Sequence, residues 1–265
     1  MMVEPAVRIS QGSKFFGEIC AFRSINLQVP EGQFLAVVGA SGSGKTTVLR
    51  CVAGLERLSG GSIVAAGRPV TRPDPSRTYV FQDYGRSLFP WRRVAANVSF
   101  PQEMRGKGRR VARERALGYL ELVGLRERAD AYPWQLSGGM QQRVAIARAL
   151  AAEPSMLLMD EPFGAVDAQT RMELQLALLR IWMELRKTVI FVTHDIDEAL
   201  FLSDRIVVID SRGQGLAMDE PVDLPRPRSH AETPRYDLYS EMRASVLRLL
   251  LREEGSEAPH APTTQ

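Results

Sequence analysis

The segment "GASGSGKTT", residues 39–47, constrains the fold of this chain more than any other part of its sequence. It follows the apolar run "FLAVVGA" (34–40), opens a helical pattern, and matches the spacing GxxxxGK[ST]. Glycines let the backbone wrap a triphosphate so that successive N–H groups point at its oxygens, and a helix N-terminus adds a favourable dipole. A flexible Gly-Ser turn is the alternative, but it does not explain the strand before it. The sequence therefore predicts a phosphate-binding loop between a buried strand and a helix.

Two side chains of this loop have predicted roles of their own. Lys45 is expected to reach the β- and γ-phosphates, and the Thr46 hydroxyl is expected to coordinate Mg²⁺. The whole loop is the predicted nucleotide contact, and it comprises Gly39, Ala40, Ser41, Gly42, Ser43, Gly44, Lys45, Thr46 and Thr47.

Polar residues follow three other apolar runs. Asp160 and Glu161 follow the apolar residues of "SMLLMDEP" (155–162), His194 follows "TVIFV", and Gln82 ends "TYVFQ". Ligands of parallel sheets gather at the carboxyl ends of the strands, so we expect these side chains near the phosphates. Asp160 is predicted to hold Mg²⁺ through water, with Gln82 touching both the metal and the attacking water.

Glu161 and His194 are the predicted catalytic residues beside this metal. In an extended chain Glu161 points away from Asp160, which suits it to act as the base or polariser for the water. His194 is predicted to contact the γ-phosphate. The alternatives are a helix cap for the acidic pair and an ordinary core or surface role for the histidine.

Apolar strand patterns alternate with helical patterns along the chain, which favours an α/β fold with a parallel sheet covered on both faces. Strands are predicted at 7–9, 24–29, 33–38, 62–65, 77–82, 155–160, 188–192 and 205–210. From about Val94 to Ala152 the chain changes to a helical insertion, with helices at 109–123 and 138–151. Further helices are predicted at 168–186, 196–202 and 236–252, the last one after a Pro- and charge-rich surface linker that follows Leu224.

Composition narrows the class of protein further. The apolar runs of this 265-residue chain are far shorter than the ~20 residues that span a bilayer, and the start of the sequence has no apolar segment typical of a secretion signal. We therefore expect a cytoplasmic chain that does not cross a membrane, with Cys20 and Cys51 as reduced, small buried residues. Six of the eleven residues at 105–115 are basic. A solvated helix face is favoured there over contact with acidic lipid or nucleic acid, because no aromatic residues interleave with the charges.

With these motifs in place, residues 7–210 closely resemble the nucleotide-binding subunit of an ATP-binding cassette (ABC) transporter. The phosphate loop, Gln82, "LSGGMQQ" (136–142), "LLMDEP" (157–162) and His194 occur in the family's order and spacing. The resemblance implies a P-loop NTPase fold with a mixed or parallel RecA-like core, an antiparallel β subdomain and a helical subdomain at about 83–152. It implies ATP and Mg²⁺ as cofactors, a cassette domain at 1–224, and a tail at 225–265.

The resemblance also assigns residues that spacing alone leaves unexplained. Phe16 is the expected adenine-stacking aromatic, with Phe15 as the alternative. Ser137 suits a helix N-cap by itself, but in the family the signature turn acts on the ATP of a second cassette, and here that turn comprises Ser137, Gly138, Gly139 and Gln141. The loop "GAVD" (164–167) stands where the family has a dimer contact. Asp167 matches that loop, whereas Gly164 and Val166 depart from it.

The implied partners are a second copy of the chain, an integral-membrane permease at the cytoplasmic face of the cell membrane, and, indirectly, a solute-binding protein. The segment "DYGRSLFPWRRVAANVSF" (83–100) resembles the permease contact, with Phe89, Pro90 and Trp91 as an apolar spot. An ordinary loop hydrophobe packed into the core is the alternative. Together with "SDRIVVI", this segment most resembles importers of nitrate, alkanesulfonates, taurine and related anions. Two rival classes are a cassette ATPase that acts on nucleic acid or ribosomes and a subunit that holds ATP without hydrolysing it. The absence of a second cassette or long coiled coil disfavours the first rival, so no nucleic-acid partner is expected, and the presence of Glu161 and His194 disfavours the second.

Overall fold

The computed structural model describes residues 4–82, 87–164, 166–210 and 214–254. Its central sheet has six strands in the order β10-β9-β3-β8-β7-β6, and all neighbours are parallel except the pair β10 and β9. The strands are β3 (Phe34–Val38), β6 (Arg77–Val80), β7 (Met156–Asp160), β8 (Thr188–Val192), β9 (Arg205–Ile209) and β10 (Leu216–Pro221). Every residue of β3, β7 and β8 is buried, as expected for apolar strands covered on both faces.

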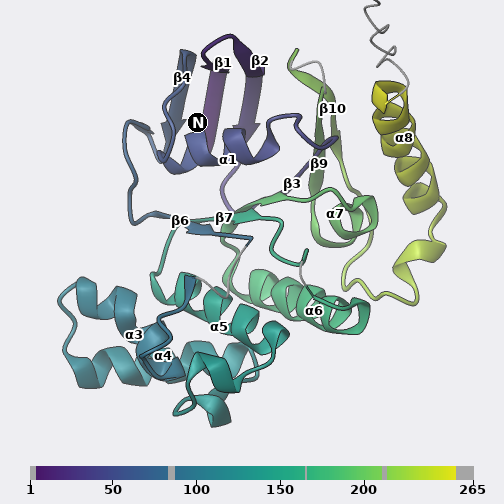
Figure 1. Ribbon diagram of the computed structural model, residues 1–265. Helices are drawn as coiled ribbons and strands as arrows, with labels where there is room; N and C mark the ends of the chain where they lie inside the picture. Colours follow the sequence, from purple (N-terminus) through teal and green to yellow (C-terminus); the bar gives the residue numbers. More distant parts are fainter. Residues whose placement is uncertain (1–3, 83–86, 165, 211–213, 255–265) are drawn as a thin grey trace, which may run out of the picture.

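A second, antiparallel sheet lies above the central one in Figure 1 and has the strand order β2-β1-β4-β5. Its strands are β1 (Val7–Phe16), β2 (Ile19–Val29), β4 (Gly60–Ala65) and β5 (Arg68–Pro69). Helix α1 (Lys45–Ala53) packs between the two sheets, and its apolar side chains share one buried cluster with residues of both. The phosphate loop therefore starts from a strand in the middle of the central sheet and leads into a helix that packs against one sheet on each side.

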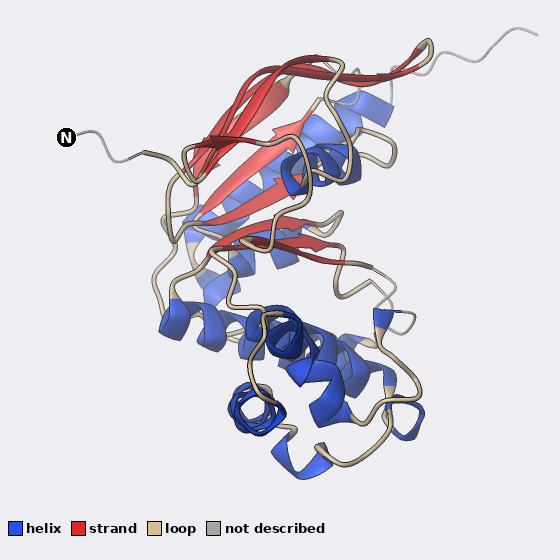
Figure 2. Cartoon of the chain, turned by 90° about the vertical axis from the view of Figure 1, so that its left-hand side faces the viewer, coloured by secondary structure: helices blue, strands red, loops and turns tan. Residues whose placement is uncertain are grey.

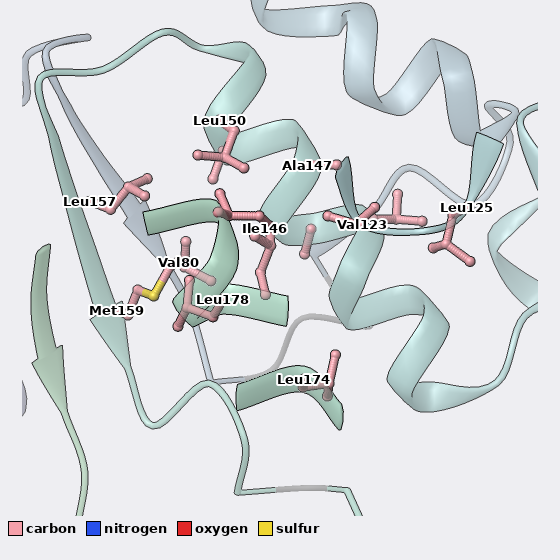
Figure 3. Close-up of a cluster of buried hydrophobic side chains, with 14 of the residues drawn as sticks. Val80, Val123, Leu125, Ile146, Ala147, Leu150, Leu157, Met159, Leu174 and Leu178 are labelled. Carbon is pink, nitrogen blue, oxygen red and sulfur yellow. The ribbon is translucent and has the colours of Figure 1, made fainter. Parts of the chain in front are cut away.

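Helices cover the opposite face of the central sheet (Figure 2). They are α3 (Val94–Met104), α4 (Arg109–Leu122), α5 (Gly138–Ala151) and α6 (Ala168–Leu185), with short 3₁₀ turns at η1 (Arg126–Arg128) and η2 (Pro133–Gln135). Figure 3 shows their core, in which Ile146 and Leu150 of α5 and Leu178 of α6 meet Val80 and Met159 of the sheet. Because this single core joins α5 and α6 to the strands, it fixes the position of the turn at 136–139 relative to the central sheet.

The carboxyl-terminal part packs beside β9 and includes α7 (Ile196–Leu202), η3 (Thr233–Arg235) and α8 (Asp237–Glu254). The segment before α8 lies largely at the surface, as its composition predicts, but a buried arginine anchors it. Arg228 is buried, and its guanidinium donates to the carbonyl oxygens of Leu200, Phe201, Ser203, Val222 and Leu224. It therefore satisfies carbonyls at the end of α7 that would otherwise lack partners.

Candidate nucleotide site

The phosphate loop lies where the sequence predicts it, between the end of β3 and the start of α1. Gly44 precedes the helix with φ 88°, and a Cβ there would lie 2.3 Å from the carbonyl oxygen of Ala21, so only glycine fits. The Lys45 ammonium donates to the carbonyl oxygens of Gly39 (2.8 Å) and Ala40 (2.7 Å). The buried hydroxyl of Ser43 has no hydrogen-bond partner within the described part of the chain. The loop thus gathers a cation, a helix N-terminus and an unsatisfied hydroxyl, all of which suit an anion.

Asp160 ends β7 beside this loop and is only 7% exposed. Its Oδ1 accepts a hydrogen bond from the Thr46 hydroxyl at 2.8 Å, and its Oδ2 accepts one from the Tyr79 hydroxyl at 2.7 Å. Burial and the neighbouring Asp160 carboxylate raise the pKa of Tyr79 above its usual range, so the phenol stays protonated and donates. Two residues that sequence analysis places at the metal, Thr46 and Asp160, are therefore in direct contact.

Glu161 is the meeting point of the other two strand ends. Its Oε2 accepts a hydrogen bond from Gln82 Nε2 at 3.2 Å and lies 3.2 Å from Nδ1 of His194. The strand pattern predicts an extended chain at Glu161, and that prediction is wrong. Glu161 has φ 42°, and its N–H donates to the carbonyl oxygen of Val192. That left-handed turn, rather than strand alternation, directs Glu161 away from Asp160.

The loop that carries His194 is held by a buried carboxylate that sequence analysis does not identify. Glu198 is 5% exposed and accepts hydrogen bonds from Thr193 Oγ1 (2.5 Å) and from Nε2 of Gln175 on α6 (3.0 Å). Burial raises the pKa of Glu198. Asp195 caps α7 by accepting from the Glu198 N–H, so both neighbours of His194 in the chain are fixed.

These residues surround an open cavity of about 480 Å³. Its lining includes Phe16, Lys45, Thr46, Glu161 and His194, together with Ile19, Cys20, Ala21, Ser41, Gly42, Gly44 and Thr47. The predicted loop residues Gly39, Ala40 and Ser43 are not part of this lining. A cavity that runs from an aromatic ring to a phosphate loop has the form of a nucleotide site.

The aromatic wall favours Phe16 over the alternative Phe15. Phe16 is 47% exposed, and the Lys14 ammonium lies 4.5 Å from its ring centroid. Phe15 does not line the cavity, and its ring lies 5.4 Å from the guanidinium carbon of Arg23. Cys20 is exposed at the cavity wall, so its prediction as a buried residue is wrong, whereas Cys51 is buried as predicted. The wrong prediction has a local cause, since Cys20 lies at the end of a hairpin strand that projects beyond the core.

The signature turn lies elsewhere, at the start of α5, and none of its residues lines the cavity. Ser137 caps the helix by accepting from the Met140 N–H at 3.4 Å, and Gln141 donates to the carbonyl oxygens of Pro133 and Leu136. Ser137 and Gly138 are exposed, whereas Gly139 is buried. The turn is therefore part of the site only if something brings it to a nucleotide that its own chain does not hold.

Gly139 has a reason within its own chain that the sequence does not reveal. A Cβ at Gly139 would lie 2.3 Å from the Cγ2 methyl of Thr170 on α6. The backbone N–H of the same Thr170 donates at 3.0 Å to the side chain of Asp167, the N-cap of α6. Hydrogen bonds from Thr170 lower the pKa of the Asp167 carboxyl. The two predicted dimer elements, the turn at 137–139 and Asp167, are thus packed together through one threonine. Ala165 of the same loop lies outside the described residues.

A phosphate loop, a carboxylate at the end of a neighbouring parallel strand and a second carboxylate beside it define the class of nucleotide-hydrolysing P-loop proteins. Within that class, the chain belongs to the ABC transporter family, whose match covers residues 22–164. It is the ATP-binding subunit of an importer, an ATPase coupled to transport, and the predicted fold class is confirmed.

Relatives of named transport function support this assignment. The chain is 49% identical over 224 residues to an aliphatic sulfonates import ATP-binding protein of Agrobacterium fabrum, with 84% of this chain and 77% of that one covered. It is 44% identical over 223 residues to a nitrate import ATP-binding protein of Synechocystis, with 84% and 82% covered. Among solved structures, a dimeric ATP-binding cassette in a post-hydrolysis state with ADP and Pi matches with a TM-score of 0.70 and 33% identity, covering 82% of this chain and 98% of that one.

Proposed function

We propose that this subunit powers the import of a small anion, such as nitrate, an alkanesulfonate or taurine, through a membrane permease by ATP-driven pairing of two cassettes. The observation that carries the proposal is the meeting of Gln82, Glu161 and His194 beside the Thr46–Asp160 contact. The similarity to the nitrate and aliphatic sulfonates import proteins supports the choice of solute class. The subunit is expected at the cytoplasmic face of the membrane, held there by the permease and, indirectly, serving a solute-binding protein.

ATP fits the cavity by its chemistry. Phe16 offers a ring for adenine at one end, and Lys45 and the α1 N-terminus offer charge and donors for phosphates at the other. The buried Ser43 hydroxyl of the same loop lies outside the cavity lining and has no hydrogen-bond partner among the described residues. Gly39, Ala40, Ser41, Gly42, Gly44 and Thr47 complete the predicted loop contacts. An unsatisfied buried hydroxyl costs about 1–3 kcal/mol, so a phosphate oxygen that accepts from Ser43 would relieve that cost.

The donor set beside the phosphates fits Mg²⁺. Thr46 and Asp160 supply hydroxyl and carboxylate oxygens, which a hard cation prefers, and Gln82 can add an amide oxygen. When bound, Mg²⁺ neutralises charge on the phosphate oxygens. Asp160 needs no change of position for this role, because its carboxylate is already turned toward Thr46.

The hydrolytic step assigns different work to the second group of residues. Glu161 accepts a proton from the attacking water or polarises it, and Gln82, which donates to the same carboxylate, orients that glutamate. His194 reaches the γ-phosphate from the end of β8. Proton transfer by a positioned side chain contributes roughly 10²–10⁴-fold to a rate.

The proposed site is completed by a second cassette. Ser137, Gly138, Gly139 and Gln141 of one copy would face the ATP of the other, with Asp167 at the contact between copies. Two facts support this arrangement: the signature turn lines no part of its own chain's cavity, and the solved relative with ADP and Pi is dimeric.

A groove of about 650 Å³ is the proposed permease contact, and it lies between the edge strand β6 and the helices α3 and α5. Its walls include Phe81, Phe89 and Phe100, with Arg148 held by hydrogen bonds to Ser87. Trp91 is 74% exposed nearby, with its ring centroid 5.6 Å from that of Phe89. Residues 83–86 of the predicted contact segment lie outside the described residues. Exposed aromatics beside an apolar groove are common interface anchors.

None of the helices in the described part of the chain has the length and hydropathy needed to cross a bilayer. Action on nucleic acid or ribosomes is the alternative function. ATPase stimulation by nucleic acid, weakened by salt, would favour that alternative.

Replacing Glu161 by Gln tests the proposed chemistry. We expect steady-state turnover to fall by about 10² or more, while ATP binding persists and a dimer accumulates on size-exclusion chromatography with ATP and Mg²⁺. Glu220→Gln is the matched control, because Glu220 is exposed on β10. Unchanged turnover in the Glu161 variant would refute the role of this residue.

A further inference from the structure

Tyr79 makes a contact that neither the motifs nor the proposed reaction uses. It lies on β6, the edge strand, next to β7, and its hydroxyl donates to Asp160 Oδ2 at 2.7 Å. The other carboxylate oxygen, Oδ1, accepts from Thr46 at 2.8 Å. Asp160 is therefore held by one donor from β6 and one from α1.

The Tyr79 ring is itself held in place. It packs at the margin of the buried cluster around α1, and its centroid lies 4.6 Å from that of Phe81. Tyr79 and Phe81 also line the groove between β6 and the helices. Tyr79 is thus one of the residues that line the groove, and its hydroxyl binds the buried carboxylate.

The chemistry of a carboxylate makes this contact relevant to a metal. The terminal torsion of aspartate is soft, so an unrestrained carboxylate samples many orientations. Two hydrogen bonds, one to each oxygen, fix its plane and leave the remaining lone pairs in set directions. Groups that orient a metal-binding carboxylate in this way usually affect metal affinity by about 10-fold or more.

We infer that Tyr79 is a positioning residue that orients Asp160 for Mg²⁺. The inference rests on the proposed function, in which Asp160 is the metal carboxylate. It assigns to an aromatic residue of the edge strand a role in metal binding rather than in contact with the nucleotide.

The experiment measures the affinity of a non-hydrolysable ATP analogue twice, with Mg²⁺ and with EDTA, and takes the ratio of the two as the contribution of the metal. Tyr79→Phe keeps the ring and removes the hydroxyl. We expect the ratio to fall about tenfold or more, the size of one hydrogen bond to a charged group, with the affinity in EDTA unchanged. Broadening of the Mn²⁺ signal in electron paramagnetic resonance, recorded with the same analogue, should weaken in parallel.

Two further variants separate the possible failures. Tyr239→Phe removes a matched hydrogen bond, from the Tyr239 hydroxyl to Asp197 Oδ1 at 2.8 Å, and should leave the ratio unchanged. Asp160→Asn should lower the ratio more than Tyr79→Phe does. If Asp160→Asn leaves the ratio unchanged, the proposed role of Asp160 is wrong. If only Tyr79→Phe leaves it unchanged, or lowers affinity equally with Mg²⁺ and EDTA, Tyr79 is structural and the inference is overturned.

Discussion

The edge of the central sheet and the start of α5 use their polar groups in opposite ways. At the carboxyl ends of the central strands, the loop after β3, Glu161 after β7 and His194 after β8 line one cavity, and Glu161 contacts both Gln82 and His194. At the start of α5, Ser137 and Gln141 form hydrogen bonds within the chain, and neither residue lines the cavity beside the loop at 39–47. In the proposed function, the first region holds the nucleotide, whereas the second acts only on the nucleotide of another copy.

This difference indicates which properties belong to one chain and which to a pair. Binding of nucleotide should depend on the sheet edge alone, whereas turnover should depend on both regions. Variants at the phosphate loop should therefore lose nucleotide binding, whereas variants at the start of α5 should lose turnover alone.

Lys45→Ala should break the sheet-edge site outright. Lys45 is buried, and its ammonium is the cation nearest the carbonyl oxygens that shape the loop. Charge-assisted hydrogen bonds to phosphate are the strong ones, so we expect ATP affinity to fall about 100-fold or more in a fluorescence titration. Lys107→Ala, at an exposed position in the turn between α3 and α4, is the control and should bind normally. Wild-type affinity in the Lys45 variant would contradict the phosphate role.

Ser137→Arg should leave ATP binding near normal and lower turnover by about 10² or more, because it fills the turn that a second copy would need. Ser137→Ala separates this effect from loss of the helix cap, which costs about 1 kcal/mol of stability. If the cap alone matters, the alanine and arginine variants will have the same turnover.

Mixing two inactive variants tests whether the phosphate loop of one chain and the turn at 137–139 of another form one shared site. A dimer of Lys45→Ala and Ser137→Arg chains carries both defects at one shared site and none at the other. Partial recovery of ATPase activity on mixing is therefore expected if the sites are shared. Full activity in Ser137→Arg alone would exclude a shared site.

The sequence predicts well which polar residues gather at the carboxyl ends of the central strands, because their positions follow from local patterns. Apolar runs identify β3, β7 and β8, parallel strands end at one edge, and the polar residue after each run must then lie there. The same reasoning cannot predict Tyr79, because which carboxylate a strand residue reaches depends on the register of β6 against β7. The turn at Glu161 cannot be predicted in this way either, because a left-handed backbone conformation after a strand has no signature in the pattern of apolar residues.

Errors elsewhere in the fold have a common physical origin. Strand β10 has an exposed, acidic pattern without strict alternation, so its existence depends on pairing with β9 rather than on its own residues. Arg228 lies in a segment whose composition indicates solvent, yet five carbonyl oxygens compensate its burial. In each case a tertiary partner outweighs the local preference, and a single sequence does not name that partner.

Gly139→Ala gives the smallest expected effect and tests the seam between the turn and α6. A methyl group at this position meets Thr170 Cγ2 at 2.3 Å, so the helices must shift. Overpacking lowers the free energy of unfolding by about 1–3 kcal/mol, and the better helix propensity of alanine offsets roughly 0.5–1 kcal/mol of that loss. We expect the free energy of unfolding to fall by about 1–2 kcal/mol in chemical denaturation.

Thr170→Ser removes the obstructing methyl group while keeping the N–H that Asp167 accepts. The double variant should therefore regain most of the lost stability, and the coupling in this double-mutant cycle measures the contact directly. The added methyl group would lie inside the chain, so the double variant should also regain turnover. A double variant that is stable yet inactive would show instead that the glycine is needed for close approach to a partner's phosphate. The cycle thus decides whether Gly139 serves the rigidity of its own chain or the contact between two.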